Sequence, residues 1–317
     1  RAPVRLRPGV AGCRPSQPES LSLGTRVALS CRRMGVAAVM FWATVVAAAA
    51  GAALALAAGW RWRSASRSAI ARLTACRSRA RGNFSHQDLA GLPPPVAHYL
   101  GRVLHEGQPL IRAARVEQEG TFFLPNGKGR WAPMEAVERF LIKPAAFVWD
   151  ARLRLLPAPV FVRDSYMDGS GEMEASIAGL HSVAHDAALP RLNAGALQRY
   201  LAESVWFPTA LLPSSGVSWK AVDAHTAIAT LTDNDASVWL RFHFDEAGDV
   251  VQVEGDRYHE DHGRYELRPW IVTCHDYESH SGVRIPSVCE VAWQLPTGLQ
   301  TYWKGHITGV SYEFAET

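Results

Sequence analysis

A stretch without charged side chains runs from Val36 to Gly59, and arginines follow it closely. At roughly 1.5 Å per residue, a helix of about 24 residues reaches about 36 Å, which is enough to cross a hydrocarbon core of about 30 Å. Seven arginines lie within residues 61–81, and a positive flank of this kind usually stays on the cytoplasmic side. The pattern predicts one membrane-spanning helix over residues 34–60, with the rest of the chain in the cytoplasm.

A cleaved signal peptide is the alternative interpretation of this stretch. Half of its residues are alanine, which inserts less readily than leucine, and Ala55-Leu56-Ala57 resembles a cleavage box. Signal peptides usually have an apolar region of about 7–15 residues and rarely precede so many arginines. The sequence therefore favours a retained, single-pass anchor in the cell inner membrane, and it leaves cleavage and the side of the membrane open.

The chain divides into four predicted parts. Residues 1–33 are rich in proline and lack apolar periodicity, which predicts a disordered extension. Met34 is a candidate start of translation, in which case this extension is not translated natively; a transit peptide is the other interpretation. Residues 61–91 are expected to form a basic juxtamembrane helix and a linker, and residues 92–317 a β-rich soluble domain.

Charge is divided unevenly along the chain. Residues 1–81 contain 14 arginines, no lysine and a single acidic residue, Glu19. The totals of 33 basic and 30 acidic residues therefore leave 19 and 29 for residues 82–317, a net charge of −10. The basic segment suits an anionic lipid surface, whereas the acidic remainder argues against nucleic acid as a partner.

Alternating apolar residues predict a mainly β domain. Asn126-Gly127 is a strong hairpin signal between residues 114–124 and 130–142, and a second hairpin turns at Asp168-Gly169. Helices are expected from Pro95 to about His105 and from Ala194 to about Trp206. Further strands are predicted at 147–155, 226–233, 236–246, 249–258, 270–278, 284–294 and 302–314. We expect about ten strands in a large curved antiparallel sheet or half-barrel, packed on a helix.

Two of the five cysteines lie in this domain. Cys274 and Cys289 are equidistant from the predicted turn at Ser281-Gly282, so they are expected to face each other across two strands. They would stay reduced in the cytoplasm and could bridge in an oxidising compartment. No cysteine pair has the spacing of a zinc site.

Motifs of the common enzyme classes are absent from the sequence. No nucleophile elbow, phosphate-binding loop, dinucleotide fingerprint or zinc-protease motif is present, and no cofactor is predicted. The polar run His259-Glu260-Asp261-His262 is interpreted as a solvated loop between strands, and no metal site is predicted.

Asp164 is the first candidate for a functional role. Val162, Asp164 and Tyr166 share one face of a strand, opposite Met173 and its neighbours, and this face is otherwise apolar. A carboxylate there must be paired or have a shifted pKa. It forms a structural ion pair, for instance with Arg257, or it has a binding or acid–base role inside a cavity.

Glu203 is the second candidate, one residue away from the apolar stripe of its helix. It precedes Trp206-Phe207, and it is either an exposed partner of Arg199 one turn back or a member of the site. No catalytic residue is assigned with certainty, and Asp164 and Glu203 are the candidates. The predicted ligand-binding residues are Asp164, Tyr166, Glu203, Trp206, Phe207 and Arg257.

Three segments carry a resemblance to a known family: Leu92 to Val96, Phe147 to Ala151, and Arg199 to Pro213, which contains Trp-Phe-Pro-Thr-Ala-Leu-Leu-Pro. The chain resembles, over about residues 40–317, an uncharacterised bacterial family of single-span membrane-anchored proteins. The pattern Tyr-x4-Gly-x3-Pro from Tyr277 to Pro286 is also similar to the lipoprotein-carrier half-barrels. The second resemblance implies a sheet wrapped around a helix and an apolar cavity for acyl chains.

Three functions remain open. The leading hypothesis is a non-catalytic, membrane-anchored module that binds a lipid or another apolar ligand, because aromatic residues are frequent and catalytic motifs are absent. The second is a structural or protein-interaction domain at the membrane, with an unknown protein partner. The third is a hydrolase-like enzyme that uses Asp164 and Glu203, which requires carboxyl groups less than about 10 Å apart.

Overall fold

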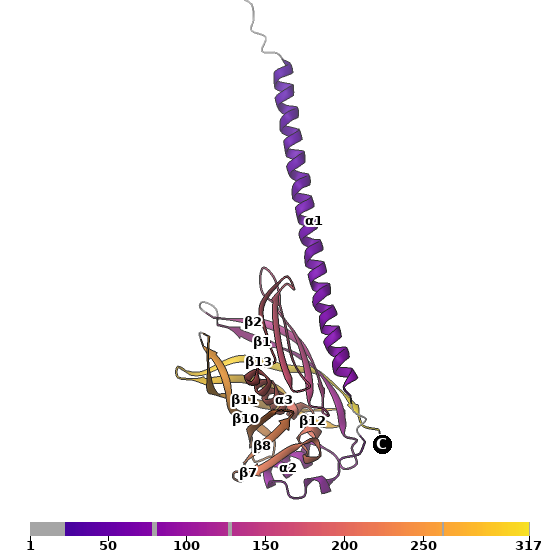
Figure 1. The fold of residues 1–317 in the computed structure, drawn as a ribbon, viewed down its shortest axis with the longest axis vertical. Helices are drawn as coiled ribbons and strands as arrows, with labels where there is room; N and C mark the ends of the chain where they lie inside the picture. The colour runs from indigo at the N-terminus through magenta and orange to yellow at the C-terminus, as the bar shows by residue number, and fades with distance from the viewer. Residues whose placement is uncertain (1–22, 78–80, 126–128, 262, 317) are drawn as a thin grey trace, which may run out of the picture. The chain divides into compact units, whose positions relative to one another are not determined.

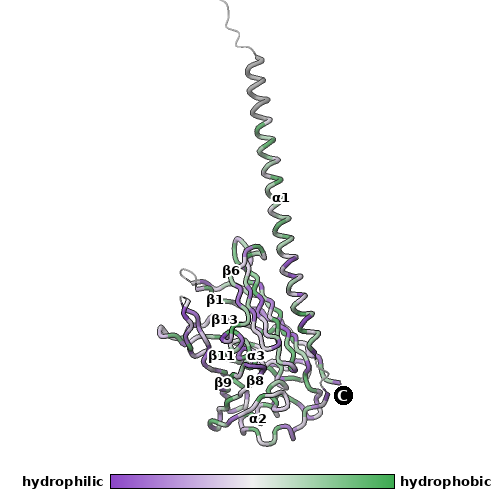
Figure 2. Tube along the Cα trace, viewed as in Figure 1, coloured by the Kyte–Doolittle hydropathy of each residue, from purple (hydrophilic) through white to green (hydrophobic). Residues whose placement is uncertain are grey.

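The computed structural model describes residues 23–77, 81–125, 129–261 and 263–316, and it divides the chain into two units at residue 54. Helix α1 (Leu23–Ala75) begins in the first unit and ends in the second. Its part from Gly35 onward is long and apolar enough to cross a membrane, as predicted. Figure 2 shows the apolar stretch within α1 and the polar residues that follow it. The boundaries at residues 34, 61 and 92 stay predictions.

Within its described residues, the second unit contains one antiparallel sheet of 13 strands that is not closed (Figure 1). The strands are β1 (Ile111–Leu124), β2 (Arg130–Leu141), β3 (Ala146–Leu153), β4 (Val160–Met167), β5 (Ser170–Ile177), β6 (His181–Ala187), β7 (Val217–Ala221), β8 (Thr226–Asp233), β9 (Ala236–Phe244), β10 (Val250–Asp261), β11 (Arg264–His280), β12 (Val283–Leu295) and β13 (Gly298–Phe314). The predicted fold class is confirmed. The predicted number of strands was too low, because β6 and β7, the edge strands, have few apolar residues in alternation.

Two meanders form this sheet. β1–β6 follow one another on one side and β7–β13 on the other, and the pairing of β1 with β13 joins the two. At this seam Gly120 lies opposite Gly305, where the chains approach too closely for larger residues. A Cβ on Gly120 would lie 2.0 Å from the carbonyl oxygen of Lys304. Glycine is therefore required where the first and last strands meet.

The strand registers agree with the sequence analysis at three hairpins. β1 pairs with β2 as the Asn126-Gly127 signal predicts, although the turn itself lies outside the described residues. Asp164 lies opposite Met173, and Cys274 lies opposite Cys289 with the sulfur atoms 3.5 Å apart. The interpretation of His259–Asp261 as a loop was wrong, because these residues extend β10 in its ladder with β11.

Helix α3 (Pro190–Glu203) crosses between the two meanders and packs on strands of both, including β4, β5, β8 and β9. Leu197 and Leu201 are fully buried, and the chain leaves the helix through a 3₁₀ turn, η2 (Ser204–Trp206), before Pro208. A shorter helix, α2 (Pro94–Val103), covers the end of the sheet where β9 meets β10 and places Tyr99 against Phe244. The remaining 3₁₀ turns are η1 (His86–Leu89), η3 (Pro208–Leu211) and η4 (Pro213–Ser215).

The last part of α1 packs on the sheet. Trp62, Ser66, Ala69 and Leu73 recur every three or four residues, and all are buried. Trp62 stacks on Phe161, and Arg163 of β4 donates a hydrogen bond to Ser66. Residues 61–75, the first part of the predicted juxtamembrane segment 61–91, are therefore attached to the sheet by their apolar face, while Arg61, Arg63, Arg67 and Arg72 are exposed.

The close approach of β1 and β13 at Gly120 and Gly305 can be tested by adding a single methyl group. We expect Gly120→Ala to lower the free energy of unfolding by about 1–3 kcal/mol, the usual effect of overpacking, because the methyl group meets backbone atoms that cannot move aside. Gly59→Ala is the control, since its Cβ meets only the Arg63 side chain at 3.6 Å and it lies within a helix. Urea unfolding followed by tryptophan fluorescence measures both. Equal stability of the two variants would contradict the assignment of a tight seam.

Candidate ligand-binding site

Helix α3 positions the centre of the site. Gly171 of β5 donates a backbone hydrogen bond to Asn193 Oδ1, and Gln198 donates from Nε2 to the carbonyl oxygen of Asp256 in β10. These bonds connect the helix to strands from opposite halves of the sheet. Arg199 and Glu203, one turn apart, consequently face the concave side of the sheet.

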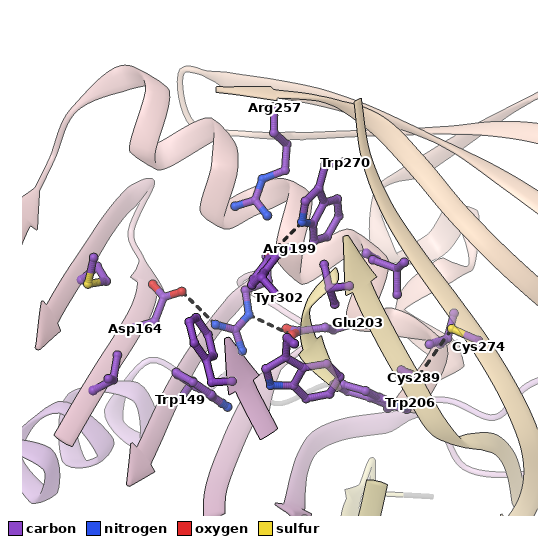
Figure 3. A pocket seen from close by; sticks show the side chains of 18 residues that line it. Trp149, Asp164, Arg199, Glu203, Trp206, Arg257, Trp270, Cys274, Cys289 and Tyr302 are labelled. Carbon is purple, nitrogen blue, oxygen red and sulfur yellow. Dashed lines mark hydrogen bonds and ion pairs between the residues drawn. The ribbon is translucent and has the colours of Figure 1, made fainter. Parts of the chain in front are cut away.

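Arg199 binds three carboxylates. Its NH2 lies 2.9 Å from Glu138 Oε1, its NH1 lies 2.8 Å from Asp164 Oδ2, and its Nε lies 2.8 Å from Glu203 Oε1 (Figure 3 labels Asp164, Arg199 and Glu203). The guanidinium also lies over the Trp149 ring at 4.7 Å. Burial acts to lower the pKa of Arg199, but the three carboxylates raise it by a larger amount. The pKa of Arg199 therefore lies well above its usual value.

Glu138 is completely buried in this cluster. Its Oε2 accepts a hydrogen bond from Gln118 Nε2 at 3.1 Å, and Gln118 Oε1 accepts one from Trp149 Nε1 at 2.9 Å. Burial raises the pKa of Glu138 well above its usual value, and the charges of Glu203 and Asp164 add to the shift while Arg199 opposes it. Burial likewise raises the pKa of Glu203. A single cation therefore faces more carboxyl groups than it can neutralise, and a retained proton relieves the excess negative charge.

A cavity of about 220 Å³ adjoins this cluster (Figure 3). It exceeds the roughly 150 Å³ of an apolar protein cavity that binds benzene. Its apolar lining comes from α3, η2 and strands of both meanders: Phe122, Trp149, Val162, Met173, Ala202, Val205, Trp206, Trp270, Val272, Val291 and Trp303. Cys274, Cys289 and Tyr302 also line it, and Trp270 donates to the Tyr302 hydroxyl at 2.9 Å.

Arg257 is the second cation at the cavity, and it forms no ion pair with any residue that the structure describes. Its guanidinium lies 4.4 Å from the centre of the Trp270 ring and packs against Gly195 of α3, where a Cβ would come within 3.1 Å. Burial lowers the pKa of Arg257, although an arginine remains charged at neutral pH. A partly buried guanidinium without an ion-pair partner among the described residues is a favourable site for an anionic group.

Two further polar atoms at the cavity are buried without a hydrogen-bond partner among the described residues. They are Glu203 Oε2 and Trp206 Nε1. An unpaired buried polar atom costs about 1–3 kcal/mol, so such atoms are rare unless a ligand or a solvent molecule pairs with them. Together with Arg257 they give an apolar cavity a small number of specific polar contacts.

The structure brings four of the six predicted ligand-binding residues to one cavity: Asp164, Glu203, Trp206 and Arg257. Tyr166 and Phe207 are placed elsewhere. Tyr166 is fully buried and donates to Asp233 Oδ2 at 2.8 Å, while Phe207 packs on Phe140 with ring centroids 4.3 Å apart. Both pack in the core and do not line this cavity, so their role in binding stays a prediction.

The predicted ion-pair partners also need correction. Asp164 pairs with Arg199 rather than with Arg257, because α3 places Arg199 between the two candidate carboxylates. Glu203 does pair with Arg199 one turn back, but the pair is largely buried rather than exposed, with the two side chains 15% and 16% accessible. Glu138 was missed, although the alternation of Met134, Ala136 and Phe140 places it on the inward face of β2.

A metal site is not formed by the residues in the described parts of the chain, where no three His, Cys, Asp or Glu side chains gather to hold an ion. His259, which belongs to the polar run noted in the sequence, contacts the Trp293 ring edge-to-face at 4.9 Å.

The chain belongs to a family of unknown function, DUF6544, whose pattern matches residues 82–305. No curated protein matches the sequence. Among solved structures, it is similar to a LolA-superfamily protein from Nitrosomonas europaea, with 8% identity and a TM-score of 0.28 over 73% of this chain and 94% of that one. It is also similar to a beta-barrel-like protein of a domain of unknown function, DUF1849, from Brucella abortus, with 8% identity and a TM-score of 0.20 over 65% and 99%.

The central role of Arg199 can be tested by removing its charge. We expect Arg199→Met to lower the free energy of unfolding by about 3–5 kcal/mol, because it leaves three carboxyl groups without a cation. Arg241→Met is the control: it removes an exposed pair with Glu254 and should cost less than about 1 kcal/mol. Urea unfolding at neutral pH measures both. A loss for Arg199→Met no larger than that of the control would show that the cluster is dispensable.

The raised pKa of Glu138 gives a second prediction, on pH dependence. The folded protein keeps a proton on Glu138 at pH values where the unfolded chain, with a glutamate pKa of about 4.3, has lost it. Stability is therefore expected to fall as the pH rises from this value through the raised pKa. Glu138→Gln should reduce the dependence of the free energy of unfolding on pH, and the remaining dependence should include the contribution of Glu203. Urea unfolding over a pH series measures it, and an unchanged slope in the variant would contradict the assignment.

Proposed function

We propose that the domain binds a small amphipathic molecule, with an apolar body in the cavity and an anionic group on Arg257. The observation that carries this proposal is the combination of an aromatic-lined cavity with a partly buried arginine that forms no ion pair in the described structure. A fatty acid or one chain of a lipid has this chemistry. The volume of about 220 Å³ suits part of an acyl chain rather than a whole lipid.

The same proposal includes the membrane anchor. Residues 34–60 would cross the inner membrane once, and the domain would lie in the cytoplasm, because the seven arginines at residues 61–81 outnumber the three that lie close before the apolar stretch, Arg26, Arg32 and Arg33. A domain tethered in this way would lie next to the bilayer, in which an apolar ligand would be dissolved.

A hydrolase-like enzyme is the alternative that one measurement supports. Asp164 Oδ2 and Glu203 Oε1 bind two nitrogens of the same guanidinium, at 2.8 Å each. With C–N bonds of about 1.33 Å the two nitrogens lie roughly 2.3 Å apart, so these oxygens are at most about 8 Å apart. This separation is within the range of paired-carboxylate hydrolysis. However, Arg199 occupies both carboxylates, which weakens either one as a base, and a binding role accounts better for Arg257.

Native mass spectrometry of the full chain, released from gentle detergent, tests the binding proposal. We expect an additional mass in the lipid range, and we expect Val291→Trp, which fills the cavity, to remove it. A clean mass that persists after incubation with extracted lipids would contradict the proposal and favour an interaction domain with a protein partner.

The role of Arg257 is tested by comparing two probes of equal chain length, a fatty acid and the corresponding fatty alcohol. We expect Arg257→Gln to weaken the binding of the acid by roughly 10- to 100-fold, since a hydrogen bond to a charged group contributes about 1.5–3 kcal/mol, and to leave the alcohol unchanged. Arg241→Gln, on the neighbouring strand and paired with Glu254, is the matched control. Quenching of tryptophan fluorescence measures the affinities. Equal losses for acid and alcohol would show that Arg257 has a packing role only.

The location of the domain is tested by the cysteine pair. Cys274 and Cys289 have adjacent sulfur atoms, so an oxidising compartment would join them, whereas the cytoplasm would keep both as thiols. We expect maleimide labelling of denatured protein, taken from cells under acid quench, to modify both thiols. Labelling that appears only after reduction would contradict the cytoplasmic location, and Cys274→Ser identifies the signal.

A further inference from the structure

One edge of the sheet carries six hairpin turns. Because every neighbouring pair of strands is antiparallel, the turns β1–β2, β3–β4, β5–β6, β8–β9, β10–β11 and β12–β13 all lie at the same end of the strand ladder, and Asn234 in the β8–β9 turn packs on Gly169 of the β4–β5 turn. We call this end the hairpin edge. The opposite end is covered by α2, where His98 approaches Gly248 and His105 approaches Gly282 in the turns there (Figure 1).

Large apolar side chains are exposed along the hairpin edge. Leu156 is 89% exposed, Leu299 60%, Leu180 58% and Leu267 55%, and the aromatic rings of Trp131 and Tyr265 are also exposed. The apolar residues of α2 at the other end, by contrast, are buried. A single exposed leucine is ordinary, but apolar side chains gathered on one edge indicate an interaction surface.

Helix α1 meets the domain at this same edge. The backbone of Ala58 packs on Gly179 in the β5–β6 turn, where a Cβ would lie 2.9 Å from the Ala58 carbonyl oxygen. Leu56 and Trp60 are exposed beside this contact. The apolar stretch ends at Gly59, so the chain itself keeps the hairpin edge within a few residues of the end of the span.

We propose that the hairpin edge rests on the surface of the lipid bilayer. Tryptophan and tyrosine favour the membrane interface, and the exposed Arg61, Arg63 and Arg67 would lie at the level of lipid phosphates. Complete burial of each leucine side chain favours association by about 1.5–3 kcal/mol. The tether makes this contact intramolecular, with an effective concentration on the order of millimolar, so a shallow contact is enough to orient the domain.

The cavity then opens toward the bilayer. An outer recess of about 630 Å³ shares Phe122, Arg257 and Tyr302 with the inner cavity. Its outer walls include Phe123 and Pro125 before the β1–β2 turn and Leu295 to Thr297 at the β12–β13 turn. This step rests on the proposed function: a ligand would pass from the membrane through the recess to Arg257 without crossing water.

Depth-dependent quenching in the full chain tests the orientation. The chain is reconstituted in vesicles of phosphatidylcholine and phosphatidylglycerol, with Cys13, Cys31 and Cys76 replaced by serine. An environment-sensitive fluorophore is attached at Leu299→Cys or Leu180→Cys, while Cys274 and Cys289 are buried. Lipids that carry a spin label should quench both positions several-fold more than Val222→Cys, an exposed apolar control in the β7–β8 turn at the other end.

The outcomes separate this proposal from the binding function. Quenching that is equal at all three positions, or stronger at Val222→Cys, overturns the orientation whether or not a ligand binds. With the expected quenching, Leu299→Glu combined with Leu180→Glu should slow the transfer of a fatty acid from vesicles and leave binding from detergent solution unchanged. Unchanged transfer would overturn the route through the hairpin edge, whereas failure to bind under both conditions would count against the proposed function alone.

Discussion

The ion-pair cluster around Arg199 is the interaction on which the concave side of this domain depends. One guanidinium connects β2, β4 and α3 by binding a carboxylate from each. These charges are buried, so their desolvation is costly, and the mutual contacts together with the Gln118 hydrogen bond offset much of that cost. A core of this kind does little for stability compared with apolar packing. Its consequence is a specific position of α3 on the sheet, because Arg199 meets all three carboxylates only when the helix packs in this register.

That register positions residues of the cavity lining. Arg199 pairs with Asp164, Glu138 and Glu203, Glu203 and Trp206 line the cavity, and Arg257 lies over the Trp270 ring and against Gly195. The protein thus separates two arginines into different roles. Arg199 pairs with three carboxylates, while Arg257 has no carboxylate within ion-pair distance among the described residues. The contrast supports the proposal of an anionic group on the ligand.

The open sheet gives the cavity its access. A closed barrel would remove the strand edges, whereas this sheet joins its two meanders only at β1 and β13 and is filled on its concave side by α3. One end is covered by α2, and the other end is left as hairpins with exposed apolar tips. Helix α1 meets the domain at this end, where Ala58 packs on Gly179. This arrangement supports the proposed direction of ligand movement.

The sequence by itself determined the features that depend on local periodicity. The apolar stretch after Met34, the strand alternation and the equal spacing of Cys274 and Cys289 from a turn are all local, and they predicted the long apolar helix, the antiparallel sheet and the cysteine pairing. Asp164 was identified as a buried carboxylate for the same reason, since alternation along β4 alone places it on the apolar face. Only the tertiary structure decided its partner, because the choice between Arg199 and Arg257 depends on how α3 crosses strands distant in sequence. Tyr166 and Phe207 were predicted to lie at the site because they are close in sequence to Asp164 and Trp206. In the folded domain their side chains pack in the core, and no local sequence pattern indicates which way they point.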